Sequence, residues 1–347
     1  MFFIGYASVL FRIRNKMAIF VSHYLHTIME QQNYKIHFAP VPGHTDWTYR
    51  NIHAKHFGGV DAYYTPFIRV EKEDSFRSRD MKDCDPELNS VENLVPQVLG
   101  GEPDELDVCL QMLEGRGYKQ VDINMGCPFT MISRRGKGAG LLSDPERVRA
   151  LMDVVKEFPE IGCSVKMRLG WEDPEECLRL LPVLNSTPLA AVFLHARVGV
   201  QEYKGETDKE AFEAFYKGCE HPLFYNGDIV TVEDIHAVTE RFPRLAGVMI
   251  GRGLLSDPAL AREYVENTML SQEEKFRKFK AFHAELLAAY MERLQGDHQL
   301  LMKMKTLWEY FMPATNRKIL KKIQKSNKLT QYNEAVVKAF IPSEEEE

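Results

Sequence analysis

Cysteine is sparse in this chain of 347 residues, and its placement excludes two kinds of site. No two of the six cysteines, at positions 84, 109, 127, 163, 177 and 219, have the Cys-x-x-Cys spacing of a zinc knuckle. Such a scattered set also excludes a dense disulfide framework. We therefore expect reduced thiols in a cytoplasmic protein, and no metal site.

Long uncharged apolar runs are absent as well. The longest one near the start, Met17 to Met29, is shorter than the roughly 20 residues that a membrane-spanning helix needs. The chain begins with apolar residues ahead of its positive charges and has no small-residue cleavage site, so this segment does not fit a signal peptide. We expect residues 1–33 to be an extension with a non-native or misassigned start, the functional chain beginning near Met29. A peripheral helix is the alternative, and we expect no membrane partner.

The chain also has little excess of either charge, with 44 Lys and Arg against 50 Asp and Glu, a net charge of −6. That balance does not suggest nucleic acid, so a nucleic-acid site would have to be a local basic patch. One such cluster comprises Arg317, Lys318, Lys321, Lys322, Lys325 and Lys328. A solvated helix face explains the cluster equally well.

What the sequence does contain is an alternation of short apolar runs with amphipathic stretches. Eight runs end in glycine or polar residues: "HFAPVPG", "AYYTPFIRV", "LVPQVLGG", "QVDINMGCP", "SVKMRLGW", "AAVFLHARV", "LFYNGDI" and "GVMIGRG". Apolar strands that alternate with helices indicate a parallel sheet covered on both faces. Eight such units in about 230 residues favour a (β/α)8 TIM barrel. A Rossmann fold is disfavoured, because "GKGAG" lacks the Gly-x-Gly-x-x-Gly spacing.

The pattern changes after Glu266, where helical periodicity continues and no strand signal returns. We predict a barrel over residues 34–266, a small helical domain over 270–341 and an acidic tail over 342–347. Within the barrel, Asp144 and Pro145 are typical of the first positions of a helix.

Polar residues gather at the predicted strand ends. A lone strand-end Lys, His or Cys is usually a solvated or packed residue, but six consecutive strands each bring such a group to one rim. Barrel enzymes place their chemistry at that rim. The residues are Gln97, Asn124, Cys127, Lys166, Arg168, His195, Arg197, Asn226, Asp228 and Arg252.

The last two strands end in glycine-rich turns. Gly227, Gly251 and Gly253 would let backbone amides approach an anion closely, and Arg252 could add a charged clamp. In this fold a phosphate site is often built from these two loops. The turns therefore predict a phosphorylated cofactor or substrate.

Taken in order, these motifs resemble the tRNA-dihydrouridine synthases over about residues 36–262. The segments that carry the resemblance are "DINMGCP", "GKGAGLL", "VKMRLGW", "HARVGVQEYKGE", "NGDI" and "VMIGRG". The resemblance implies an FMN-bound barrel that reduces uridine in tRNA to dihydrouridine, with NADPH as the reductant. A departure is the first loop, "APVPGHTD", where the family usually has methionine after the proline.

The resemblance also implies roles for single residues. Cys127 matches the catalytic cysteine, Gln97 a glutamine at the flavin edge, Lys166 a flavin-contacting lysine and His195 a histidine near the phosphate. Asn124 would orient the base or the flavin. The other positions implied to bind the cofactor are Pro40, Val41, Pro42, Asn226, Gly227, Asp228, Gly251 and Arg252.

A thiol suits the implied reaction, because hydride addition to C6 of uridine must be matched by a proton at C5. A cysteine of ordinary pKa is mostly protonated at neutral pH and can act as a general acid. Pro128 should stiffen the turn that aims the Cys127 thiol.

A uridine in folded tRNA must leave its stack to reach a barrel, and cationic contacts to phosphates would offset that cost. We expect these contacts from Arg134, Arg135 and Lys137 beside the active loop, from Arg197, and from Lys321, Lys322 and Lys325 in the helical domain.

Two alternatives remain open from the sequence. One is an FMN barrel oxidoreductase acting on a small molecule, as a dihydroorotate dehydrogenase does. The other is an RNA-binding protein on an inactive barrel, which intact Cys127 and Lys166 disfavour. We expect a monomer in each case.

Overall fold

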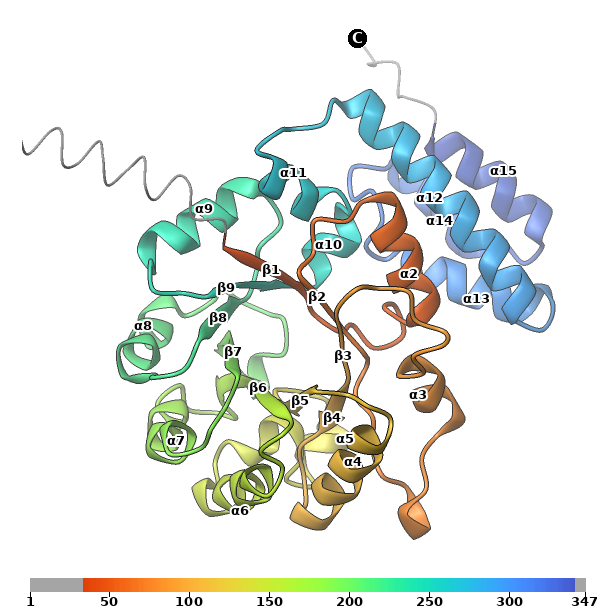
Figure 1. Cartoon of the computed structure of the whole chain (residues 1–347). Coiled ribbons are helices and arrows are strands. Elements are labelled where there is room, and N and C mark those ends of the chain that lie inside the picture. Colours follow the sequence, from red (N-terminus) through yellow and green to blue (C-terminus); the bar gives the residue numbers. More distant parts are fainter. Residues whose placement is uncertain (1–33, 341–347) are drawn as a thin grey trace, which may run out of the picture. The chain divides into compact units, whose positions relative to one another are not determined.

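The computed structural model describes residues 34–340, so the predictions for residues 1–33 and 342–347 lie outside the described residues. Residues 35–340 form one compact unit around a single nine-stranded sheet (Figure 1). Its order is β3-β2-β1-β9-β8-β7-β6-β5-β4, with every pairing parallel. The strands are β1 Lys35–Phe38, β2 Ala62–Tyr64, β3 Leu94–Val95, β4 Gln97–Leu99, β5 Gln120–Met125, β6 Gly162–Gly170, β7 Ala191–Val198, β8 Leu223–Asn226 and β9 Gly247–Ile250.

The predicted third strand is divided in two by Pro96, which has no N–H to donate to a ladder. β3 pairs with β2, whereas β4 pairs with β5. The two halves, which Pro96 connects, are therefore the two edge strands of the sheet. The Pro96 carbonyl accepts from Asp122 N at 2.9 Å, and Gln97 N donates to Thr65 Oγ1 at 3.0 Å. The predicted TIM barrel is confirmed, with its third strand broken at this point.

Helices follow the strands as the alternation predicts. The predicted start of α6 is confirmed, because Pro145 is its first residue and Asp144 accepts from Arg147 N at 3.2 Å. The helices of the barrel are α2 Trp47–His56, α3 Ser78–Asp83, α4 Pro103–Gly115, α5 Thr130–Ser133, α6 Pro145–Lys156, α7 Glu176–Asn185, α8 Lys209–Gly218, α9 Val232–Arg241, α10 Arg252–Ser256 and α11 Leu260–Glu266. Short 3-10 turns lie at Lys72–Asp74, Gly138–Leu141 and Gly199–Gln201.

The region after the barrel is helical, as predicted. It contains α12 Gln272–Arg293, α13 Gly296–Leu307, α14 Arg317–Lys325 and α15 Leu329–Ala339. Within the predicted helical domain the helices are interrupted between α13 and α14, in a stretch that contains Pro313. Among the described residues, no helix is both long and apolar enough to cross a membrane.

Asp46 joins the start of α2 to the helices that follow the barrel. Its carboxylate caps α2 by accepting from Tyr49 N at 3.1 Å, and it accepts from the Tyr290 hydroxyl at 2.7 Å. Arg293 at 3.0 Å and Lys303 at 3.2 Å complete the set of partners. These two cations lower the pKa of Asp46 in spite of its burial. One carboxylate therefore fixes α12 and α13 beside the loop that follows β1.

We expect Asp46→Ala to lower the free energy of unfolding by about 3–5 kcal/mol, because it leaves two half-buried cations without their shared partner. Urea denaturation followed by circular dichroism measures this loss. Asp46→Asn is the matched control: it keeps the helix cap and should lose less. An unchanged midpoint in Asp46→Ala would show that this carboxylate does not anchor the helices.

Candidate active site

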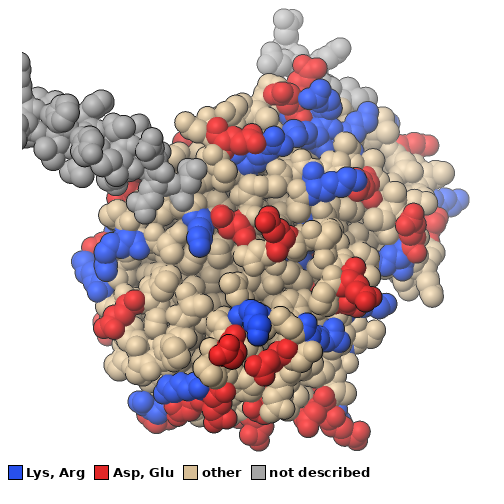
Figure 2. Space-filling view, viewed as in Figure 1, with Lys and Arg blue, Asp and Glu red and all other residues tan. Residues whose placement is uncertain are grey.

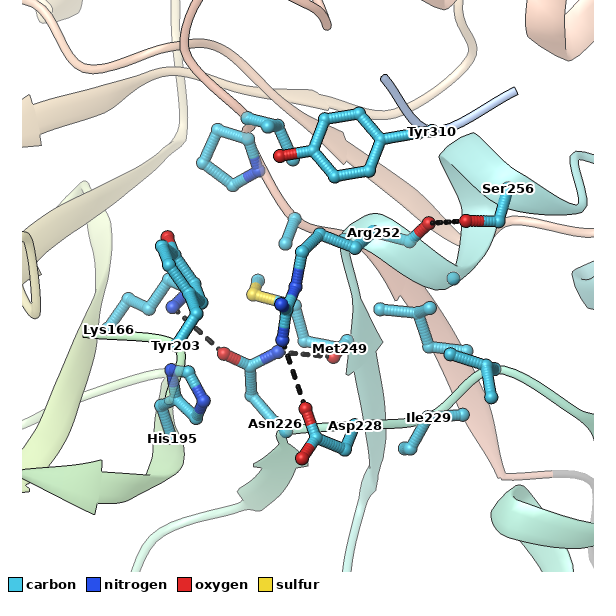
Figure 3. Close-up of a pocket in the computed structure, with 18 residues that line it drawn as sticks. Lys166, His195, Tyr203, Asn226, Asp228, Ile229, Met249, Arg252, Ser256 and Tyr310 are labelled. Carbon is cyan, nitrogen blue, oxygen red and sulfur yellow. Dashed lines mark hydrogen bonds and ion pairs between the residues drawn. The ribbon is translucent and has the colours of Figure 1, made fainter. Parts of the chain in front are cut away.

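A cavity of about 410 Å³ opens at the carboxyl ends of β1, β6, β7, β8 and β9 (Figure 3). Its lining combines the β1 loop, polar residues from β6 to β8, and the turn that leads into α10. Most of the residues predicted to bind the cofactor meet here: Pro40, Val41, Lys166, His195, Asn226, Gly227, Asp228, Gly251 and Arg252. Residues that lie as far apart in the sequence as Pro40 and Arg252 therefore line one cavity.

Glycines let the backbone come close to this cavity. Gly227 has φ of 138°, and a Cβ there would lie 2.8 Å from the Thr207 side chain. A Cβ on Gly253 would clash with the Ile229 carbonyl. The N–H groups of Leu254 and Leu255 donate to the Gly251 carbonyl at 3.1 and 3.3 Å, whereas those of Arg252 and Gly253 precede the first hydrogen bond of α10 and can reach an anion.

Lys166 lines the cavity from β6. Its ammonium donates to Asn226 Oδ1 at 3.0 Å, and Asn226 Nδ2 donates to the Met249 carbonyl at 2.7 Å. Burial, together with the nearby Arg168, lowers the pKa of Lys166 to about 8. The Asn226 amide is thereby fixed with its oxygen toward the lysine.

His195 is surrounded by cations. Burial lowers its pKa most, and Arg168, Lys166, Arg197 and Arg252 each lower it further, so the ring is neutral. Arg197 Nη1 lies 3.3 Å from Nε2 of the ring. Because a guanidinium only donates, Nε2 must accept and the proton resides on Nδ1. The ring can then donate one hydrogen bond from Nδ1.

Asp228 is held between two arginines. Both of its carboxylate oxygens accept from Arg197, and Oδ1 also accepts from Arg252 at 3.0 Å. Arg197 also donates to the Gly205 carbonyl at 2.6 Å and is only 1% exposed. The predicted contact of Arg197 with RNA is therefore corrected: this side chain is buried and orients Asp228.

The Cys127 turn rests on a buried network of side chains. Asn124 Oδ1 accepts from the backbone N–H of Gly126 at 3.0 Å and of Cys127 at 2.9 Å. Its Nδ2 donates to Gln97 Oε1 at 2.8 Å, and Gln97 Nε2 donates to Asp122 at 2.7 Å. Ser164 Oγ also donates to Asp122, at 2.7 Å. The strand-end amides that were predicted to face a ligand thus also fix the backbone that carries the thiol.

The thiol itself is half-buried at the end of β5. Burial raises the pKa of Cys127, and the Phe129 backbone, Arg168 and Lys166 offset only part of that increase. The thiol is therefore protonated at neutral pH. All six cysteines are free, and the other five are buried, so Cys127 is the one that a substrate can reach.

Two tyrosines of the site, Tyr203 and Tyr310, were not among the predicted site residues, although Tyr203 lies in the "HARVGVQEYKGE" segment. The Tyr203 ring packs against two guanidinium groups. The guanidinium carbon of Arg252 lies 4.6 Å from the ring centre, and that of Arg168 lies 5.4 Å from it. Tyr310 comes from the stretch between α13 and α14 and stands over the opposite wall of the cavity (Figure 3). Its ring packs edge-on against His44 at 4.9 Å. Tyr310 follows α13, far from the barrel strands in the sequence, so nothing in its sequence position indicates that it lines the cavity.

A family model described as dihydrouridine synthase matches residues 37–344. The chain belongs to the dihydrouridine synthase family. The predicted resemblance and enzyme class are confirmed, and the family match favours tRNA uridine reduction over the small-molecule alternative and over an inactive scaffold. Forming dihydrouridine from uridine is a two-electron reduction, so the enzyme is an oxidoreductase.

Curated relatives of this dihydrouridine synthase agree with the match. Similarity to tRNA-dihydrouridine synthase B of Pasteurella multocida is 28% identity over 232 residues, 66% of this chain and 68% of that protein. A probable tRNA-dihydrouridine synthase 1 of Synechocystis is 29% identical over 274 residues, 78% of this chain and 72% of that protein. A tRNA-dihydrouridine(16) synthase of Aquipseudomonas alcaligenes is 31% identical over 237 residues, 66% and 74% of the two chains.

Among solved structures, morphinone reductase is similar in fold with a TM-score of 0.50. The sequence identity is 10%, and the likeness covers 71% of this chain and 89% of that one. The similarity concerns the barrel architecture alone.

The residues that were predicted to contact RNA fall into two groups in this dihydrouridine synthase. Arg134 and Arg135 are exposed beside the Cys127 turn. Lys137 instead pairs with Glu105 at 2.5 Å, and its side chain is 21% exposed. Arg134 and Arg135 are therefore the cations of this loop that remain open to a partner.

The tail cluster lies on α14 and just beyond it. Ile323 is the only buried residue of α14, whereas Lys321, Lys322 and Lys325 are exposed. The helix thus presents cations on its free surface, as both the RNA-contact prediction and the solvated-face alternative require.

Proposed function

We propose that this chain is an FMN-dependent tRNA-dihydrouridine synthase that reduces the C5=C6 bond of specific tRNA uridines, with NADPH as the reductant. The observation that carries the proposal is the protonated thiol of Cys127, held by Asn124 at the end of β5, beside the strand that brings Lys166 into the glycine-lined cationic cavity. A thiol in that state can donate a proton, and the cavity suits a phosphorylated cofactor. FMN, when bound, would supply the hydride for C6.

The cavity suits the FMN phosphate for two reasons. Several cations surround His195, which makes the pocket attractive to an anion. The backbone N–H groups of Arg252 and Gly253 and the Arg252 guanidinium would donate to phosphate oxygens. Asp228 does not oppose this, because its charge is already balanced by two arginines. A volume of about 410 Å³ lies within the usual range for a cofactor pocket.

The remaining polar groups would orient the cofactor and the base. The Pro40–Pro42 loop would lie against the flavin, and Lys166 would place a cation beside it. Gln97 keeps one N–H of its amide after bonding Asp122, and His195 keeps Nδ1–H. Each of these donors is fixed by a partner on its other side. The site is therefore organised before any ligand arrives, which lowers the cost of binding.

Cys127 would donate its proton to C5 of the uridine. Burial keeps the thiol protonated, and Asn124 fixes the backbone amide of Cys127, so the direction of the thiol is constrained. Pro128 limits the backbone further. This arrangement provides a general acid in the correct protonation state at neutral pH.

The direct experiment is to incubate the purified protein with NADPH and unmodified tRNA, and to measure dihydrouridine by mass spectrometry. We expect yellow protein and dihydrouridine at specific positions. Deletion of the gene should remove dihydrouridine from those positions in cellular tRNA. Colourless protein, or reduction of orotate but not of tRNA, would reject the proposal.

We further propose that the helices over residues 270–341 form the tRNA-binding part of the protein. On the face drawn in Figure 2, Lys and Arg residues lie among Asp and Glu residues. Affinity for RNA must therefore come from local groups of cations and not from a uniform field. The exposed lysines of α14 are one such group.

Reversal of Lys321, Lys322 and Lys325 to Glu should weaken tRNA binding strongly. The dependence of log K on log salt should flatten by up to about 0.9 for each duplex phosphate that the variant no longer neutralises. NADPH oxidation should be unchanged, because these lysines do not line the cavity. Fluorescence titration at several salt concentrations measures both affinity and slope.

A matched control changes the net charge equally at the other end of the barrel. Lys119, Lys156 and Lys217 are exposed near the ends of α4, α6 and α8, away from the strand-end rim. Their reversal to Glu should leave the salt slope near that of the parent. Equal effects in the two triple variants, or unchanged affinity in the α14 variant, would mean that α14 is simply a solvated helix.

A further inference from the structure

An exposed apolar pair follows the Cys127 turn. Phe129 is 55% exposed and Met131 is 69% exposed, although both are large hydrophobic side chains. They lie two and four residues after Cys127, at the start of the short helix α5. Two such side chains together beside a reactive group indicate a surface that a partner covers.

The segment that carries this pair is firmly anchored. The Cys127 carbonyl accepts from Ala139 N at 3.0 Å, and Gly138 N donates to the Gly100 carbonyl at 3.1 Å. Gly140 packs so closely against α5 that a Cβ would clash with the Ser133 carbonyl. The apolar tips are therefore exposed on a rigid support and not on a loose loop.

The charges around the pair suit a nucleic acid. Arg134 and Arg135 are exposed on the same segment, directly after α5. The segment thus offers apolar tips followed by two cations. Stacked bases combine an apolar face with flanking phosphates, so this order matches their chemistry.

The substrate creates a need for such a surface. If the proposed function is correct, a uridine must leave its stack in folded tRNA to reach Cys127, and this costs a few kcal/mol. Apolar side chains that enter a vacated step offset that cost in other nucleic-acid-binding proteins. We propose that Phe129 and Met131 form a wedge that contacts the bases next to the extruded uridine. This inference rests on the proposed function and names the part of the RNA that α5 contacts.

The test compares two substrates. In the double variant Phe129→Ala, Met131→Ala, kcat/KM for folded tRNA should fall by about tenfold to 100-fold, the range that base–aromatic stacking supplies. Activity on a short single-stranded RNA that contains the same uridine should be unchanged, because no stack must be opened. NADPH oxidation should also be unchanged. The single variant Phe129→Trp, with Met131 unchanged, should keep the parent's activity on tRNA, since it keeps an aromatic face at this position.

Met269→Ala is the matched control for loss of an exposed apolar side chain. Met269 is 59% exposed and lies just before α12. Arg293, at the end of α12, pairs with Asp46 at the start of α2. Glu285, earlier in α12, pairs with Lys55 near the end of α2. The two helices therefore run antiparallel. The 22 residues of α12 span about 33 Å, which places Met269 far from the rim.

The outcomes separate this inference from the proposed function. Unchanged kcat/KM of the double variant on tRNA would overturn the wedge and leave the function intact. Equal loss on both substrates would also overturn it, because the pair would then serve the Cys127 turn itself. A concentration-dependent dimer that is lost in the double variant, with activity on tRNA unchanged, would identify a second copy as the occupant. Absence of dihydrouridine with the parent protein on either substrate would reject the function, and the wedge with it.

Discussion

Cys127→Ala should retain bound FMN and oxidise NADPH at the parent rate, while dihydrouridine formation falls by about 100-fold or more. The thiol is held by the Asn124 turn and lies outside the lining of the cofactor cavity, so its loss should leave the flavin site intact. Its proton is needed only when the uridine is reduced. Stopped-flow spectrophotometry of the two half-reactions, with mass spectrometry of the tRNA, measures the separation.

Cys219→Ala is the matched control, because Cys219 is a free thiol on the outer side of the barrel, at the end of α8. It should behave as the parent in both half-reactions. If Cys127→Ala slowed NADPH oxidation as much as dihydrouridine formation, the thiol would have a structural role and the assignment of a general acid would fail.

Arg252→Glu should yield folded protein with little bound flavin. The change removes a cation from the proposed phosphate site and places a new carboxylate beside Asp228. A carboxylate beside the FMN phosphate, where a guanidinium stood before, costs several kcal/mol through like-charge repulsion, so FMN affinity should fall by at least about 100-fold. Visible absorbance of the purified protein and titration with FMN measure the loss, and circular dichroism checks the fold.

Arg262→Glu is a close control for this change. Arg262 and Arg252 have the same 36% exposed side chain, and Arg262 is paired with Glu266 on α11, outside the cavity. Its reversal should leave the flavin in place. Full flavin occupancy in Arg252→Glu would contradict the placement of the phosphate at the turn into α10.

The site could be predicted to the extent that it depends on strand ends. In a parallel barrel every strand delivers its last residues to one rim, so Lys166, His195, Asn226 and Arg252 could be grouped from the sequence alone. The glycine turns were informative for the same reason, since Gly227 and Gly253 are required by the close approach of the backbone.

The remaining features depend on contacts between distant parts of the chain. Nothing near Arg197 in the sequence shows that it will be buried and paired with Asp228, and nothing near Tyr310 shows that the chain after α13 will bring it to the cavity. The division of the third strand was readable in principle, because Pro96 cannot donate to a ladder, but an apolar run on both sides of it concealed the break.

The most direct test of the proposed reaction is the stoichiometry between NADPH and dihydrouridine under anaerobic conditions. The protein should be supplied with limiting NADPH and an excess of tRNA transcript that contains no modified bases. We expect one dihydrouridine for each NADPH oxidised in the parent protein, and almost none in Cys127→Ala within the same time. Oxidation of NADPH in the parent without dihydrouridine in the tRNA would contradict the proposed reaction.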